Sequence, residues 1–114
     1  SWQSFDLTAF YPGAPSASAI VIRVPVARVI TFADEFAGSY ALASVAATGS
    51  TVFDVQKNGV SVGSITFSAA GTTGAFTTSG TTVVTAAGDL ISIHAPASPD
   101  ATLANIGFVL AGTR

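Results

Sequence analysis

The chain has 114 residues, of which 49% are hydrophobic and only 9% are charged, and its formal net charge is −2. An average globular domain carries about 25% charged residues, so Ser, Thr, Gly and Ala must cover much of this surface. The four basic residues are isolated along the chain, which excludes the basic footprint that nucleic-acid binding requires.

Other features that the sequence lacks further narrow the class of protein. The sequence contains no cysteine, so neither disulfides nor thiolate metal sites hold the fold. The longest apolar stretch, residues 19–30, is interrupted by Arg23, Pro25 and Arg28 and is too short to span a bilayer, so we expect no membrane insertion. There is also no methionine: either an initiator was removed before Ser1, or the chain is an excised or C-terminal module of a longer protein.

The first half of the chain reads as strands separated by turns. Pro12-Gly13 is a strong turn pair, and Asp34 to Gly38 reads as a turn that has room for one helical turn. Pro25 cannot donate to a sheet ladder, so we expect it at an edge, a bulge or a kink. The alanines of the fourth strand indicate that something approaches that strand closely. The strands predicted here are Phe5–Tyr11, Ile20–Val24, Val26–Phe32 and Tyr40–Ala46.

The clearest local signal is a hairpin across Lys57-Asn58-Gly59, because Asn-Gly favours a type I′ turn. The incoming strand is Thr51–Gln56 and the outgoing strand is Val60–Phe67. The apolar positions of the outgoing strand change parity at Gly63-Ser64, which predicts a β-bulge there.

The second half repeats the alternation of β-branched runs with turn residues, at the spacing typical of a sandwich or barrel. The whole chain, residues 1–114, is therefore predicted to be a single all-β domain, an antiparallel β-sandwich of eight to ten strands. Turns are expected at 69–71, 79–80, 86–89 and 96–99, and strands at Thr72–Thr78, Thr81–Thr85, Leu90–His94 and Ala101–Ala111, the last with Ile106, Phe108 and Leu110 on one face.

Several segments resemble tailed-phage, prophage and gene-transfer-agent-like virion proteins. The similarity is carried by residues 53–67, which read FDVQKNGVSVGSITF, and continues through residues 69–76, 86–93 and 100–104. The opening 5–13 and the ending 110–114 also fit the pattern of such domains.

The resemblance implies a β-sandwich, jelly-roll-like, that is displayed on a particle as a tail, fibre, spike or head-decoration component. It implies a virion location facing the extracellular side, contact with other virion proteins, and self-assembly, with a homotrimer favoured and a pentameric head spike as an alternative. It carries over no catalytic residue.

The residues themselves offer little chemistry. His94 is the single histidine, and its parity, opposite to Ile91 and Ile93, predicts a surface or edge position. A catalytic triad would pair it with Asp89 or Asp100, but no nucleophile-elbow spacing is present. Both aspartates read as turn residues, with a calcium site built on backbone carbonyls as the alternative. We expect no catalytic residue, no metal and no cofactor.

Contact with a glycan is the binding chemistry that the aromatic residues allow. Trp2, Tyr11 and Tyr40 can stack apolar area while their polar tips stay wet, whereas the eight phenylalanines read as core or interface residues. Packing is the alternative role for these three. Binding residues favour loops on a rigid scaffold, and the candidate loop tips are Pro12–Ser18, Ala33–Ser39 and Ala95–Asp100.

The sequence thus predicts a virion structural and receptor-binding module, not an enzyme, that attaches to a bacterial surface, with a glycan as the expected receptor. The alternative is a carbohydrate-binding module of a secreted bacterial enzyme or adhesin, which would have the same fold and composition. A small glycan hydrolase is the third reading, and it lacks a plausible acid–base pair.

Overall fold

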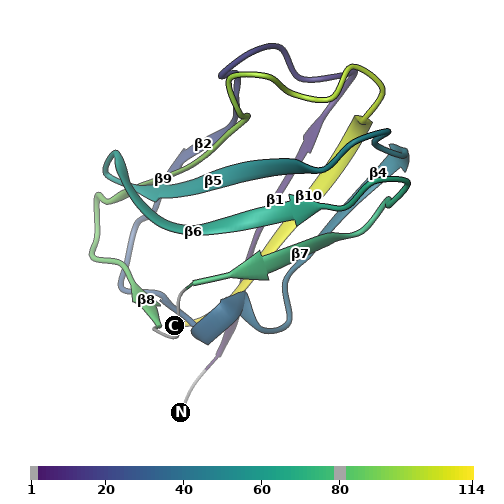
Figure 1. Ribbon diagram of the computed structural model, residues 1–114. Helices are drawn as coiled ribbons and strands as arrows, with labels where there is room; N and C mark the ends of the chain where they lie inside the picture. The colour runs from purple at the N-terminus through teal and green to yellow at the C-terminus, as the bar shows by residue number, and fades with distance from the viewer. Residues whose placement is uncertain (1–2, 79–81) are drawn as a thin grey trace.

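The structure, a computed structural model, describes residues 3–78 and 82–114 and consists of two antiparallel β-sheets packed face to face (Figure 1). This confirms the all-β sandwich expected from the sequence, with ten strands in the described part of the chain. The turn predicted at Ser79-Gly80, and the first residue of the strand predicted to begin at Thr81, lie outside the described residues.

The first sheet, sheet A, is built around its longest strand, β10. β1 pairs with one side of β10, β4 and β3 share the other side, and β8 pairs with β3. Its strands are β1 (Ser4–Tyr11), β3 (Thr31–Phe32), β4 (Tyr40–Val45), β8 (Val83–Val84) and β10 (Ala104–Thr113).

The second sheet, sheet B, has the strand order β2-β9-β5-β6-β7. The predicted Asn-Gly hairpin joins β5 to β6, and Asn58 and Gly59 have the positive φ values of 53° and 82° that a type I′ turn needs. Its strands are β2 (Ile20–Pro25), β5 (Thr51–Lys57), β6 (Val60–Phe67), β7 (Gly74–Thr77) and β9 (Leu90–His94).

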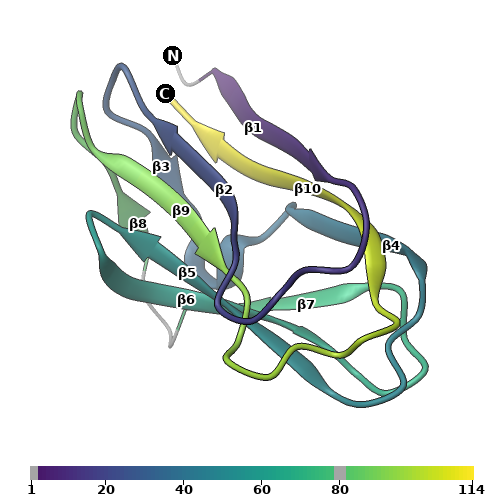
Figure 2. The same ribbon diagram turned by 90° about the horizontal axis from the view of Figure 1, so that it is seen from above.

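The pairs of strands are nested within one another along the chain. β1 pairs with β10, β2 with β9, β3 with β8 and β5 with β6, and successive pairs alternate between the two sheets (Figure 2). A long double ribbon folded over in this way has the connectivity of a jelly roll, the form of sandwich that the resemblance to virion proteins implies.

The core fills the space between the sheets. Ile106, Phe108 and Leu110 of β10 are buried on one face, as predicted, because alternate residues of a strand point to the same side. The ring of Phe53 from sheet B lies with its centroid 6.1 Å from that of Phe108 and 5.8 Å from that of Phe67, both in edge-to-face geometry, the arrangement that aromatic pairs prefer.

The strand predicted at Val26–Phe32 is wrong for most of its length. Pro25 ends edge strand β2, which fits its expected position, but only Thr31 and Phe32 form strand β3. The residues between them carry the chain from sheet B to sheet A, with Val26 and Ile30 buried. A buried apolar run therefore marks a corner here, and periodicity alone cannot distinguish it from a strand.

The β-bulge was predicted one position too late. Val55 pairs with Gly63 and Gln56 pairs with Ser61, so Val62 is the extra residue of β6. The predicted site at Gly63 lies just beyond the bulge, where a side chain is excluded because an added Cβ would lie 2.5 Å from the carbonyl oxygen of Thr77.

The predicted turn after β3 contains a short 3-10 helix, η1 (Asp34–Phe36). Glu35 and Phe36 have φ values of 59° and 48°, a left-handed conformation that is costly for residues with a side chain. The Thr78 hydroxyl holds this turn: it accepts a hydrogen bond from the Glu35 N–H at 2.6 Å and donates one to Asp34 at 2.8 Å.

Strand β4 is approached closely by β7, which explains its alanines. The Ala43 N–H donates to the Thr72 carbonyl oxygen at 2.8 Å, and Leu42 forms an isolated bridge with Thr73. Ala41 is fully buried, and a Cβ added to Gly74 would lie 3.0 Å from the Ala41 Cβ. Small residues on both strands therefore let the two sheets join along this side.

We predict that Gly74→Ala destabilises the protein by about 1–3 kcal/mol, the usual cost of overpacking a core. The new methyl group would lie 2.6 Å from Ile65 and 3.1 Å from Phe67. Urea unfolding measures the change. Gly49→Ala is the matched control, because its Cβ would have its nearest neighbour at 3.8 Å, and equal midpoints for the two variants would contradict the prediction.

Candidate functional site

The three aromatic residues singled out in the sequence do not form one platform. Trp2 lies outside the described residues. Tyr11, the last residue of β1, is half-buried and packs against the core, whereas Tyr40, the first residue of β4, is 61% exposed on the opposite side of sheet A. Any glycan contact made by Tyr11 and any made by Tyr40 would therefore lie on two separate surfaces of the protein.

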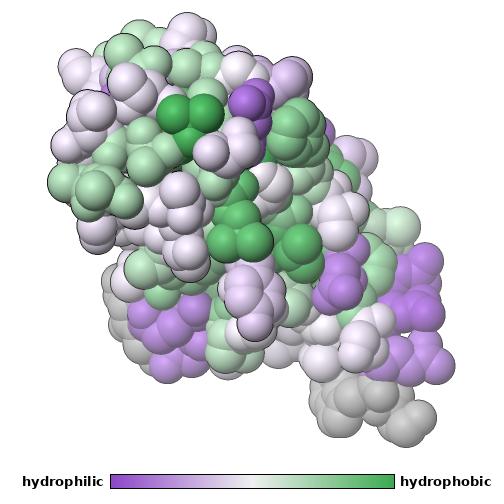
Figure 3. All heavy atoms as spheres, turned by 90° about the vertical axis from the view of Figure 1, so that its right-hand side faces the viewer, coloured by the Kyte–Doolittle hydropathy of each residue, from purple (hydrophilic) through white to green (hydrophobic). Residues whose placement is uncertain are grey.

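Sheet A has an apolar outer face. Register aligns its side chains in two rows across three strands: Phe10, Gly107 and Leu42 in one, Thr8, Val109 and Tyr40 in the next. Figure 3, seen from the side where β4 lies in Figure 1, shows hydrophobic residues grouped across the middle of the view and most strongly hydrophilic ones towards its lower part. Exposed apolar groups clustered in this way mark an interaction surface.

A shallow hollow of about 460 Å³ lies in the middle of this face. Its floor is Gly107, where an added Cβ would have nothing closer than the Leu42 carbonyl oxygen at 4.0 Å. Phe10 and Leu42 stand on either side of the glycine, so the face carries both projecting side chains and a depression between them.

Sheet B carries more polar groups on its outer face, where Ile20 and Val52 are also exposed. Asp54 of β5 accepts hydrogen bonds from Gln56 at 2.8 Å and from Ser61, and Ser92 and His94 of β9 are hydrogen-bonded to each other. Arg23 of edge strand β2 is exposed on the same sheet. These charged and hydroxyl groups make the outer face of sheet B more hydrophilic than that of sheet A.

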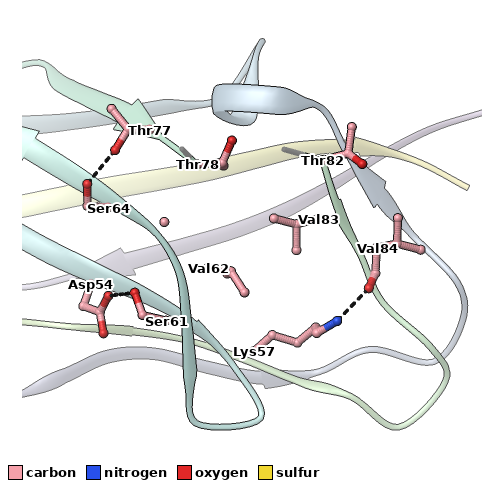
Figure 4. Close-up of a pocket in the computed structure, with 11 residues that line it drawn as sticks. Asp54, Lys57, Ser61, Val62, Ser64, Thr77, Thr78, Thr82, Val83 and Val84 are labelled. Atoms are coloured by element: carbon pink, nitrogen blue, oxygen red, sulfur yellow. Dashed lines mark hydrogen bonds between the residues drawn. The ribbon is translucent and has the colours of Figure 1, made fainter. Parts of the chain in front are cut away.

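A second hollow, of about 450 Å³, opens between the β5–β6 hairpin and β8 (Figure 4). Lys57 donates to the Val84 carbonyl oxygen at 3.0 Å on one side, and the hydroxyls of Ser64 and Thr77 bond at 2.7 Å on the other. The lining combines these groups with the Asp54–Ser61 pair and the side chains of Val62, Thr78, Thr82 and Val83. This hollow is lined by several hydroxyl groups, one carboxylate and one ammonium group.

The predicted binding loops lie at two ends of the sandwich. Loops 12–18 and 95–100 lie side by side, with the Ser18 N–H donating to the Pro96 carbonyl oxygen at 2.9 Å, and Gly13 and Asn105 bond to each other nearby. Loop 33–39 lies at the other end, beside the chain termini (Figure 1). There Gln3 and Arg114 are hydrogen-bonded through their backbones.

Asp100 cross-links the end of the sandwich that carries loops 12–18 and 95–100, the loop end. Its carboxylate accepts from the backbone and hydroxyl of both Thr48 and Thr102, and from the N–H groups of Gly49 and Leu103. The hydroxyls of Thr102 and Thr48 lower the pKa of Asp100 most, followed by the backbone N–H groups of Thr102 and Gly49. The predicted turn role is confirmed, and because the oxygens face donors, they are not arranged to coordinate a calcium ion.

Asp89 plays the same role in a smaller turn. It accepts from the Asn58 side chain at 3.0 Å and the Ala86 N–H at 2.8 Å, and these bonds lower its pKa. Asn58 in turn accepts from the Leu90 N–H at 2.9 Å. The predicted strand-entry turn is confirmed, and it links the Asn-Gly hairpin to β9.

His94 lies on the outer face, as its parity predicted, but β9 is an internal strand and not an edge. Its Nε2 lies 2.8 Å from the Ser92 Oγ, a pair that the two-residue spacing places on one face. A triad also needs a third group that orients the base, and no hydrogen bond in the described residues joins His94 to Asp89, Asp100 or Asp54.

The described part of the chain holds no cluster of metal-binding side chains and no membrane-spanning helix. No three or more His, Cys, Asp or Glu side chains in residues 3–78 and 82–114 are grouped to hold a metal ion. No helix there is long and apolar enough to cross a membrane.

Comparison with known proteins returns no family model and no curated protein that matches this chain. The similarity to phage-type virion proteins therefore stays a prediction from the sequence.

The loop end should lose stability in acid. The pKa of Asp100 is lower in the folded chain than its ordinary value of 3.8, so the folded state binds fewer protons than the unfolded state as the pH falls towards and below that value. We predict that Tm falls between pH 6 and pH 3, and that Asp100→Asn lowers Tm at pH 6 and makes the further fall smaller. Calorimetry at both pH values tests this; equal falls for the two proteins would contradict it.

Proposed function

We propose that this chain is a non-catalytic structural and attachment module of a phage-type particle: a fibre, spike or tail component that assembles with copies of itself and with other virion proteins, and contacts a glycan on the bacterial surface. The module would face the outside of the particle. The observation that carries the proposal is the exposed apolar face of sheet A, because a chain with so few charges offers contact as its main chemistry.

The arrangement of the ends supports an attachment role. Asp100 and the Gly13–Asn105 bonds make the loop end a rigid polar surface, while Gln3 and Arg114 meet at the opposite end. Any polypeptide joined at either terminus would leave the loop end free to meet a surface. Tyr11 lies directly before loop 12–18 and is the aromatic candidate closest in sequence to this end.

We predict that the purified protein binds polysaccharide from its host surface and leaves the length of the polysaccharide unchanged. Tyr11→Ala should weaken binding about fivefold, because one aromatic contact contributes about 1 kcal/mol. Calorimetric titration measures the affinity, and size analysis of the polysaccharide detects cleavage. Val52→Ala, on the outer face of sheet B, is the control; shortening of the polysaccharide, or full binding by folded Tyr11→Ala, would contradict the prediction.

The alternative, a carbohydrate-binding module of a secreted enzyme or adhesin, is favoured by one observation. The hydroxyl-lined hollow beside Asp54 has the size and the convergent polar groups of a small-ligand site. If sugar binds there, Asp54→Asn should abolish most of the affinity for soluble polysaccharide and Tyr11→Ala should not change it. The reverse pattern in the same titration would support the loop end instead.

A further inference from the structure

We propose that the outer face of sheet A, formed by Thr8, Phe10, Tyr40, Leu42, Gly107 and Val109, is the surface through which copies of this chain contact one another around a rotation axis. The occupant of the face is a second copy of the same chain. This inference rests on the assembly role proposed above and assigns it to particular residues.

Both large exposed aromatic side chains of the described residues lie on this face. Phe10 is 62%, Tyr40 61% and Leu42 53% exposed, and an aromatic side chain can bury about 200 Å². All three project from neighbouring strands of one sheet. The other large exposed apolar residues are aliphatic and dispersed over the molecule. They are Ile20, Val52 and Val60 on sheet B, Val45 and Val84 on sheet A, and Val29 at the corner between the sheets.

Charge favours a copy of the chain over other occupants. Asp6 is the one charged residue among the outward-facing positions of β1, β4 and β10. It pairs with Ala111, outside the six residues of the patch, so two copies of the patch can meet without burying an ion. Charged residues are depleted at interface cores for this reason. No basic side chain projects from these positions towards the head groups of anionic lipids, and Arg23 is on the opposite sheet.

Shape and size also fit a self-contact. Copies that meet across a twofold axis present the same patch to each other, so that patch must carry both projections and depressions. The hollow over Gly107 lies between Phe10 and Leu42. Phe10 and Tyr40 are 62% and 61% exposed, so at about 200 Å² per aromatic side chain they present about 250 Å² between them. That area would form the apolar centre of a standard interface of roughly 800 Å² per partner, with the surrounding polar residues of β1, β4 and β10 supplying the rest.

The first test places a charge on each sheet. Leu42→Lys adds an ammonium group to the outer face of sheet A, and Val52→Lys adds one to sheet B at a position of similar exposure, 45% against 53%. Sedimentation equilibrium at micromolar concentration should give the same oligomeric mass for the unmodified protein and Val52→Lys, and a mass near 11.3 kDa for Leu42→Lys. Circular dichroism checks that both variants are folded.

The second test uses the absence of cysteine, which makes any introduced thiol unique. Leu42→Cys, treated with a short bis-maleimide at micromolar concentration, should form covalent dimers, whereas Val52→Cys should stay largely monomeric. This variant keeps the face apolar, so it reports on proximity even if Leu42→Lys fails to fold.

The outcomes separate this inference from the proposed function. An oligomer whose mass is unchanged by Leu42→Lys, and whose Leu42→Cys variant does not cross-link, overturns the assignment of the face but leaves assembly in place. A strict monomer overturns both. A monomer that binds neutral phosphatidylcholine vesicles, and loses binding in Leu42→Lys, overturns the self-contact in favour of a lipid surface.

Discussion

The contact between β4 and β7 is the constraint on which the rest of the structure depends. Gly74 lets the backbone of β7 reach Ala41, and the hydrogen bond from Ala43 to Thr72 then joins the two sheets along one side. With β4 held against β10 in this way, Tyr40 and Leu42 can only point outwards. The apolar face of sheet A is therefore a consequence of how the sandwich is closed, and not of a separate binding segment.

The two outer faces differ because the few polar groups are distributed unevenly. Sheet B holds Asp54, Gln56, Ser92 and His94, which bond among themselves and their neighbours. Sheet A has no such network between Phe10 and Leu42. Because the polar groups lie mainly on sheet B, the outer face of sheet A gains more free energy than that of sheet B when it is removed from water.

Much of the fold could be predicted from local patterns. The hairpin at Asn58-Gly59 and the buried face of β10 follow from turn chemistry and a two-residue period, and both are confirmed. The corner at Val26–Ile30 could not be distinguished from a strand, because its burial depends on crossing between sheets. The bulge at Val62 is displaced by one residue, since a change of parity locates a bulge only approximately.

The candidate site was much harder to predict. Phe10 and Leu42 lie 32 positions apart, and only the register of β10 with both β1 and β4 places them on either side of Gly107. The sequence offered Tyr11 and Tyr40 together as amphipathic residues, but strand parity and pairing separate them. Turn roles, as for Asp89 and Asp100, are local and were predictable; surfaces assembled across strands were not.

The nested pairing of strands determines the order in which sheet partners become available during synthesis on the ribosome. Of the ten strands described, β1 is made before the other nine and its partner β10 is made after them. The partners β2 and β9 are separated almost as widely. Only the β5–β6 hairpin and its neighbour β7 can form from contiguous chain. Phe5, Leu7 and Phe10 therefore have no partner strand in the sheet until β10 has been made, and topologies of this kind fold slowly because distant segments must meet. The low content of charged residues suits the contact surfaces of the folded protein. In the unfolded nascent chain it leaves the unpaired strands with little charge repulsion to keep them apart from other nascent chains on the same polysome.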